Sequence, residues 1–142
     1  MNFARTAFTA FALASTVACA HAPEGTFVDD AAIVASPNPW PTPRLASPNA
    51  APQILALWMN ETSIPSGSDW YGRAITSTNV ASLEIRTESF SFVARRSGFG
   101  DFRFRQHVLD MVPFYKRGYV LQVIARNTAG DRDVRSVRID FK

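Results

Sequence analysis

Catalytic chemistry depends on a few side-chain types, and this chain of 142 residues is poor in two of them. It has one cysteine, Cys19, and two histidines, His21 and His107. Cys19 and His21 lie near the N-terminus, and His107 lies at the end of a predicted strand. A Ser–His–Asp triad, a Cys–His pair or a zinc site needs more such side chains close together. We therefore expect a non-catalytic protein with no metal site and no cofactor.

Carboxylates give two further sets of candidates. Asp101, Asp110 and Glu88 could pair as acid and base, but strand-edge carboxylates are usually solvated, and glycosidic hydrolysis needs two in one cleft. The turn Asp131-Arg132-Asp133 offers two acidic side chains, whereas Ca²⁺ takes about six to eight oxygen ligands and Arg132 repels a cation. Both sets favour solvated surface charges.

Arginines offer a better candidate for binding. Arg95, Arg96, Arg103 and Arg105 fall on two adjacent predicted strands, so their outward side chains can form one basic patch. Such a patch suits an anionic glycan, lipopolysaccharide or an acidic protein. The alternative is that arginines on edge strands only prevent sheets from pairing with other chains.

Trp70 and Tyr71 form a second candidate for binding. Consecutive residues of a strand point to opposite faces, so one of these rings should be more exposed than the other. An exposed aromatic ring can stack on a sugar or anchor a protein contact. The alternative is that one ring fills the core and the other packs at an edge.

The N-terminal residues have the layout of a secretory signal peptide. Arg5 provides a positive charge, residues 7–17 are apolar and rich in alanine, and Ala18-Cys19-Ala20 follows. A helix that spans a bilayer needs ~20 apolar residues, so this run is too short for a permanent transmembrane anchor. We expect an exported protein.

Two cleavage sites remain open. Thr16-Val17-Ala18-Cys19 resembles the lipobox of bacterial lipoproteins, which implies that residues 1–18 are removed and Cys19 carries the lipid. Alternatively, Ala18-Cys19-Ala20 is an A-x-A site, and residues 1–20 are removed together with the cysteine. The first predicts a lipoprotein of the periplasm or cell envelope, and the second a free periplasmic or secreted protein. We expect membrane contact only through such an anchor.

Charge and proline content divide the rest of the chain. The formal net charge is +3, and removal of residues 1–18 leaves 14 basic and 12 acidic residues, too balanced for a dedicated nucleic-acid binder. Seven of the nine prolines lie within residues 23–52. Such proline density favours extended backbone, so residues 21–50 are predicted to be a flexible tether. The alternatives are a proline-rich ligand that docks Trp40 into a partner, and an edge strand within residues 26–34.

Residues 51–142 have the alternation typical of short strands and no convincing helical period. Ser82 to Thr87 is one example, because Leu83 and Ile85 fall on one face and Glu84 and Arg86 on the other. Seven strands are predicted, near residues 53–60, 70–77, 82–87, 90–95, 102–107, 119–125 and 137–141, with a turn at residues 97–98. This pattern predicts an all-β fold, a single antiparallel β-sandwich without any disulfide.

The penultimate predicted strand carries a more specific pattern. Its residues Tyr119-x-Leu121-x-Val123-x-Ala125-x-Asn127-x-x-Gly130 resemble the F strand and F–G turn of fibronectin type III and related bacterial Ig-like domains. The resemblance implies a buried Tyr119 at the corner, a core filled by Leu121, Val123 and Ala125, and a hairpin that turns at Gly130. We expect an Ig-like module for protein interaction or envelope structure; the alternative is a carbohydrate-binding module of the periplasm or cell surface.

Overall fold

The computed structural model describes residues 25–142, so the predicted signal peptide and Cys19 lie outside the described residues. Its elements, in chain order, are β1 (Thr26–Phe27), α1 (Asp30–Val34), β2 (Ile54–Met59), β3 (Ser63–Ile64), β4 (Asp69–Thr76), β5 (Val80–Arg86), β6 (Ser91–Val93), β7 (Arg95–Gly98), β8 (Asp101–His107), the 3₁₀ helix η1 (Pro113–Tyr115), β9 (Gly118–Asn127) and β10 (Arg132–Phe141). Among these residues no helix has the length and apolar character needed to cross a membrane.

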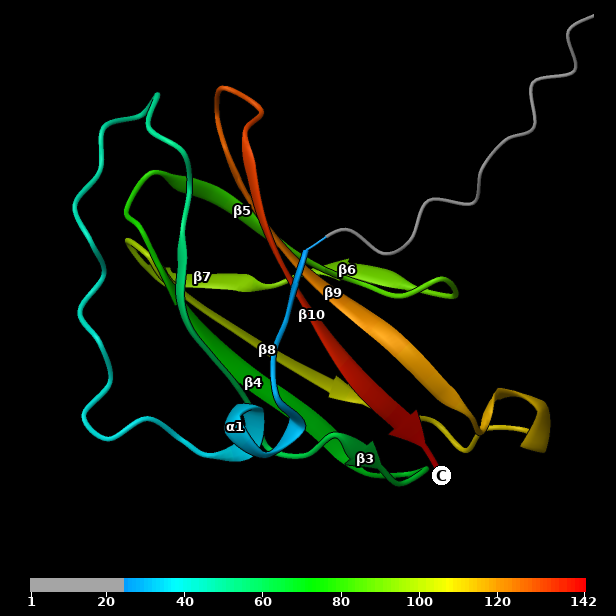
Figure 1. Cartoon of the computed structure of the whole chain (residues 1–142). Coiled ribbons are helices and arrows are strands. Elements are labelled where there is room, and N and C mark those ends of the chain that lie inside the picture. Colours follow the sequence, from blue (N-terminus) through cyan, green and yellow to red (C-terminus); the bar gives the residue numbers. More distant parts are fainter. Residues whose placement is uncertain (1–24) are drawn as a thin grey trace, which may run out of the picture.

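The strands form two sheets that pack face to face (Figure 1). One sheet has the order β1-β10-β9-β5-β6, with β3 also paired to β10, and the other has the order β2-β4-β8-β7. The pairs are antiparallel except those that β1 and β3 make with β10. The predicted all-β sandwich is confirmed.

The strand predicted at residues 90–95 is two strands in different sheets. β6 pairs with β5, and β7 pairs with β8. The chain crosses between them at Ala94, whose buried N–H donates to the Leu83 carbonyl at 2.8 Å. The turn predicted at residues 97–98 falls instead at Gly100, which has a φ of 72°. A Cβ there would lie 2.6 Å from the Thr76 carbonyl oxygen, so glycine is required.

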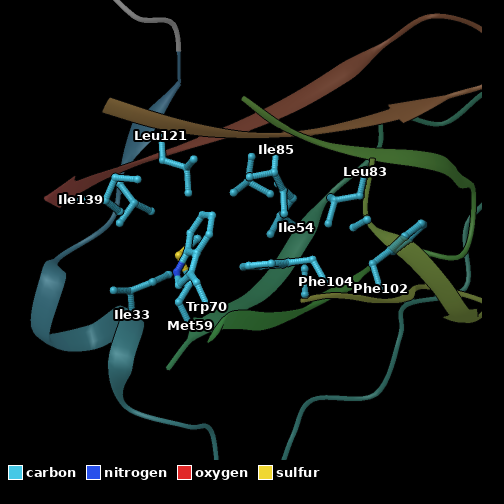
Figure 2. Close-up of a cluster of buried hydrophobic side chains, with 14 of the residues drawn as sticks. Ile33, Ile54, Met59, Trp70, Leu83, Ile85, Phe102, Phe104, Leu121 and Ile139 are labelled. Atoms are coloured by element: carbon cyan, nitrogen blue, oxygen red, sulfur yellow. The ribbon is translucent and has the colours of Figure 1, made fainter. Parts of the chain in front are cut away.

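The core lies between the two sheets and is built from the inward side chains of both (Figure 2). Trp70 points from β4 into its centre and is 1% exposed. Its ring centroid lies 4.9 Å from that of Phe104 and 6.3 Å from that of Phe92, both in edge-to-face contact. Such aromatic pairs add packing energy beyond the area they bury.

The β9–β10 hairpin matches its prediction closely. Tyr119 is buried near the start of β9, and its hydroxyl donates to the Tyr115 carbonyl at 3.1 Å. The alternating residues that follow it are fully buried: Leu121, Val123 and Ala125. Gly130 has a φ of 93°, the left-handed conformation that a tight hairpin turn requires.

Residues 25–50 pack against the sandwich, which differs from the predicted flexible tether. Asp29 caps α1 by accepting the Ala31 N–H at 2.7 Å, and so the chain enters a helix after only two residues of edge strand β1. Ile33 is 0% exposed and projects from α1 into the core, beside Met59 (Figure 2). One buried isoleucine and a capped helical turn therefore fix a segment whose prolines favour extended backbone.

Candidate functional site

The outer face of the β2-β4-β8-β7 sheet carries a row of aromatic and basic side chains. The register places Trp58 of β2 opposite Arg73 of β4, Arg73 opposite Arg103 of β8, and Arg103 opposite Arg95 of β7. Residues opposite each other on one face lie within side-chain contact distance. One continuous row therefore crosses all four strands of the sheet.

A second row lies beside the first. Tyr71 of β4 is opposite Arg105 of β8, and both are exposed, with 42% for Tyr71 and 72% for the Arg105 side chain. We call the two rows together the basic face, which consists of Trp58, Tyr71, Arg73, Arg95, Arg103 and Arg105. These six residues line an open groove of ≈ 1130 Å³.

Trp40 closes one side of this groove, although it comes from the proline-rich segment. Its ring meets that of Trp58 edge-on, with centroids 6.5 Å apart and planes at 89°. The Arg73 guanidinium lies 4.5 Å from the Trp40 ring centroid, within the range of a cation–π interaction. Trp58 also contacts Tyr71 at 61° and donates its Nε1–H to the Val34 carbonyl at 3.0 Å. The aromatic rings are thus fixed, but they are not coplanar.

Asp101 neutralises the centre of the first row. Its carboxylate accepts two hydrogen bonds from Arg73, at 3.0 Å and 2.8 Å, and lies 3.5 Å from Arg103. The hydrogen bonds from Arg73 are the main reason that the pKa of Asp101 is lowered, and partial burial opposes them. Arg73 is therefore held in place by an ion pair on one side and by Trp40 on the other.

Asp69 plays a similar but more exposed part at the edge of the face. It pairs with Arg105 and lies 3.0 Å from the His107 ring nitrogen. The pKa of Asp69 is lowered, first by the hydrogen bond from Arg105 and then by His107, and the pKa of Arg105 is raised in return. Solvent and salt screen a pair this exposed, so it contributes little to stability.

Positive charge remains on the basic face after these pairs are formed. Three of its four arginines pair with two aspartates. Arg95 is exposed and has no ion pair among residues 25–142, and the Arg103 side chain is 57% exposed with only the long contact to Asp101. Unpaired guanidinium groups beside exposed aromatic rings can bind carboxylate, sulfate or phosphate groups.

Two of the predicted surface candidates have structural roles instead. Trp70 is buried in the core and offers no ring to a partner, whereas Tyr71 is the exposed member of the pair. Arg96 donates to the Val80 carbonyl, and its guanidinium lies 5.6 Å from the ring centroids of Phe99 and Phe102. Arg96 is exposed like Arg95 and Arg103, but its guanidinium is engaged by these contacts within the sandwich.

Two residues of the site, Arg73 and Trp58, were not among the predicted candidates, and Trp40 was considered only as part of a proline-rich ligand for a partner. Arg73 was detectable, because it lies two residues after Tyr71 on the same strand and so shares its face. Trp58 lies on β2, and its place beside Arg73 depends on a register that includes a bulge between Ile54 and Ala56. Trp40 reaches the site only through the packing of residues 25–50, for which the sequence carries no periodic signal.

The acidic candidates are spread over the surface. Asp101 belongs to the basic face, Glu88 pairs with Arg117 at 2.6 Å, and Asp133 accepts the Ile54 N–H at 2.7 Å. Within residues 25–142 no three His, Cys, Asp or Glu side chains are grouped so that they could hold a metal ion. The chain matches no protein-family model, and a search of curated proteins finds none that is significantly similar to it.

Proposed function

We propose that this chain is an exported, non-catalytic β-sandwich module that binds an acidic protein partner through the basic face. The observation that carries the proposal is the row of Trp58, Arg73, Arg103 and Arg95 across all four strands of one sheet. Tryptophan, tyrosine and arginine are the residue types that contribute most to protein–protein binding energy. On this face they occur together and are partly or largely exposed.

Charge complementarity supports an acidic partner. The four arginines of the basic face outnumber Asp69 and Asp101, and the Arg95 side chain is free to pair with a carboxylate. Complementary charge speeds diffusional encounter and fixes the orientation of the partners. Trp58 and Tyr71 supply apolar area next to the charges, which is the composition expected of an interface core with a basic rim.

A carbohydrate ligand is the second candidate, favoured by the exposed Tyr71 ring in an open groove. Stacking on a polysaccharide chain calls for rings that lie flat in a row. The rings of Trp40, Trp58 and Tyr71 meet at 89° and 61° instead. This geometry favours the protein partner over the glycan.

We also propose that the module belongs among the Ig-like domains. Labelling β2, β4, β7 and β8 as strands A, B, D and E gives the order A-B-E-D, and labelling β5, β9 and β10 as C, F and G gives G-F-C. Immunoglobulin sandwiches have this strand order. The hydrogen bond from Tyr119 to the Tyr115 carbonyl is similar to the tyrosine corner of such domains.

Export and lipidation rest on the N-terminal sequence and complete the proposal. If Cys19 is acylated, the seven residue steps from Cys19 to Thr26 span at most about 25 Å. The sandwich would then lie near the membrane surface. Cys19→Ser should release the protein from the membrane fraction or leave it unprocessed, and intact mass should show a diacylglyceryl group on the wild type only. A lipid-free mature protein that begins at His21 would contradict the proposal that the chain is a lipoprotein.

The basic face can be tested by crosslinking in the exporting host. A photo-reactive amino acid in place of Tyr71 should form an adduct with one protein, identified by mass spectrometry. The double variant Arg95→Glu, Arg103→Glu should weaken binding to that protein about tenfold or more, with a loss that grows at low salt. Arg86→Glu is the matched control, because Arg86 is exposed on the outer face of the other sheet.

Two results would contradict the proposal. If the double variant binds the partner as well as Arg86→Glu does, the basic face is not the binding surface. If Tyr71 gives no protein adduct and the purified chain binds anionic polysaccharides in a way that Tyr71→Ala abolishes, the carbohydrate alternative replaces the protein partner. Circular dichroism and unfolding curves of each variant check that the fold is retained.

A further inference from the structure

The connection between β8 and β9 exposes large apolar side chains at one end of the sandwich. Leu109, Val112 and Phe114 are 74%, 59% and 76% exposed, and Tyr115 is 48% exposed. We call these four residues the apolar loop. In Figure 1 their segment, with η1, extends beyond the ends of the strands near the C-terminus. Contiguous exposed apolar patches often mark a contact surface, and within this loop the rings of Phe114 and Tyr115 contact each other edge-on.

The apolar loop is held in place, so its exposure does not come from a loose connection. η1 is closed by hydrogen bonds from the Tyr115 N–H to Val112 and from the Lys116 N–H to Pro113, at 3.0 Å and 3.1 Å. Val108, just before the exposed residues, lies in the core, and Met111, among them, packs against it. The segment thus places two apolar side chains inward and four outward. The outward four are presented by a defined turn.

Basic groups lie at the same end of the sandwich as the apolar loop, whose segment also includes Asp110. Lys116 follows η1 directly, and Arg117 donates to Glu88 while its carbonyl accepts the Phe141 N–H at 3.2 Å. That bond brings Lys142 to the same end of the molecule. Both lysines of the chain therefore lie at the same end of the sandwich as the apolar loop.

We propose that the apolar loop inserts into the interface of a bilayer that contains anionic lipids. Phenylalanine, tyrosine and leucine at the tip supply the apolar area that enters the acyl boundary, and adjacent lysines attract anionic headgroups. A protein partner fits less well, because a short turn that projects from the strand ends offers no extended flat surface. This contact is separate from the basic face and does not depend on it.

The proposal adds a membrane contact to the lipid anchor expected from the sequence. An acylated Cys19 is at most about 25 Å of chain from Thr26, which would hold the sandwich within reach of the bilayer. One shallow apolar contact binds weakly by itself, and two membrane signals together give stable attachment. The apolar loop would then orient the molecule and leave the basic face open to a partner.

The test uses residues 25–142, which contain the whole core cluster from Ile33 to Phe141 and no cysteine. Phe114→Cys is labelled with the polarity-sensitive dye NBD and mixed with phosphatidylcholine vesicles, with or without phosphatidylglycerol. We expect the dye emission to shift to the blue with the anionic vesicles. Leu45→Cys, labelled in the same way, is the matched control, because Leu45 is 89% exposed at the opposite end of β4.

Substitutions separate the contribution of the apolar side chains from that of the lysines. Val112→Ser with Phe114→Ser should abolish co-sedimentation with vesicles, and Lys116→Glu should weaken it several-fold on anionic vesicles only. Because these side chains are exposed, circular dichroism and unfolding midpoints should stay at the wild-type values. Equal shifts at positions 45 and 114, no shift at either, or protection of position 114 by a protein but not by vesicles would each overturn the proposal.

Discussion

The two faces of the β2-β4-β8-β7 sheet are built from alternate residues of the same strands, yet they differ in exposure and in side-chain chemistry. On β4, Trp70 is 1% exposed and packs on Phe104, whereas its neighbour Tyr71 is 42% exposed and lies opposite Arg105. The inner face is apolar, and the outer face is aromatic and basic. Residues adjacent in the sequence are therefore divided between the core and the surface, and the proposed binding role falls only to the outward ones.

The largest effect should come from the centre of the inner face. We expect Trp70→Ala to lower the free energy of unfolding by about 3–5 kcal/mol, since it deletes a fully buried aromatic side chain. Tyr71→Ala, one residue away, should change it by less than about 1 kcal/mol. Urea unfolding followed by circular dichroism measures both values.

Trp70→Phe sharpens this first comparison. The buried Trp70 Nε1–H has no hydrogen-bond partner among residues 25–142, so its removal relieves an unsatisfied donor. Phenylalanine keeps part of the ring contact, so Trp70→Phe should lower the free energy of unfolding by much less than Trp70→Ala does. Equal costs for Trp70→Ala and Tyr71→Ala would show that the two faces do not divide folding and binding in this way.

The next largest effect concerns residues 25–50. Ile33→Ala should lower the free energy of unfolding by about 2–4 kcal/mol, because Ile33 is fully buried. The variant should also be cleaved faster within this segment by a broad-specificity protease. Leu45→Ala is the matched control, since Leu45 lies in the same segment and is 89% exposed. If the protease cleaves this segment as fast in the wild type as in Ile33→Ala, the flexible tether is supported instead.

Much of the inner face was predictable, because alternation alone decides which residues of a strand are buried. The hairpin of β9 and β10 is the clearest case, with Leu121, Val123 and Val137 all 0% exposed. The crossing between the sheets at Ala94 was not predictable, because a chain that leaves one sheet for the other keeps the same apolar alternation. Which sheet a short strand joins depends on long-range pairing.

The outer face was predictable only within single strands. Alternation within β4 and β8 places Tyr71, Arg103 and Arg105 on the outward side of their strands, whereas the pairing of β4 with β8 is a long-range contact. Trp58 required the register of β2, and Trp40 required a proline-rich segment to fold back over the sheet. Such contacts join residues that are distant in the chain, and no local pattern specifies them.

The smallest effect separates stability from binding at a single outer-face residue. Asp101→Asn removes the ion pair with Arg73 and should cost about 1 kcal/mol or less at neutral pH. Because the pKa of Asp101 is lowered in the folded state, this contribution is fully present above the unfolded pKa, near 3.8, and is lost as pH falls through the folded pKa. Unfolding curves of wild type and variant should therefore converge in acid.

Binding should move in the opposite direction. Asp101→Asn leaves the charges of Arg73 and Arg103 without their shared carboxylate, so an acidic partner should bind the variant several-fold more tightly at low salt. Asp69→Asn is the matched comparison, with a smaller change in stability because its pair with Arg105 is more exposed. Weaker binding by Asp101→Asn would mean that the arginines must be held by Asp101 to act, and that position matters more than net charge on this face.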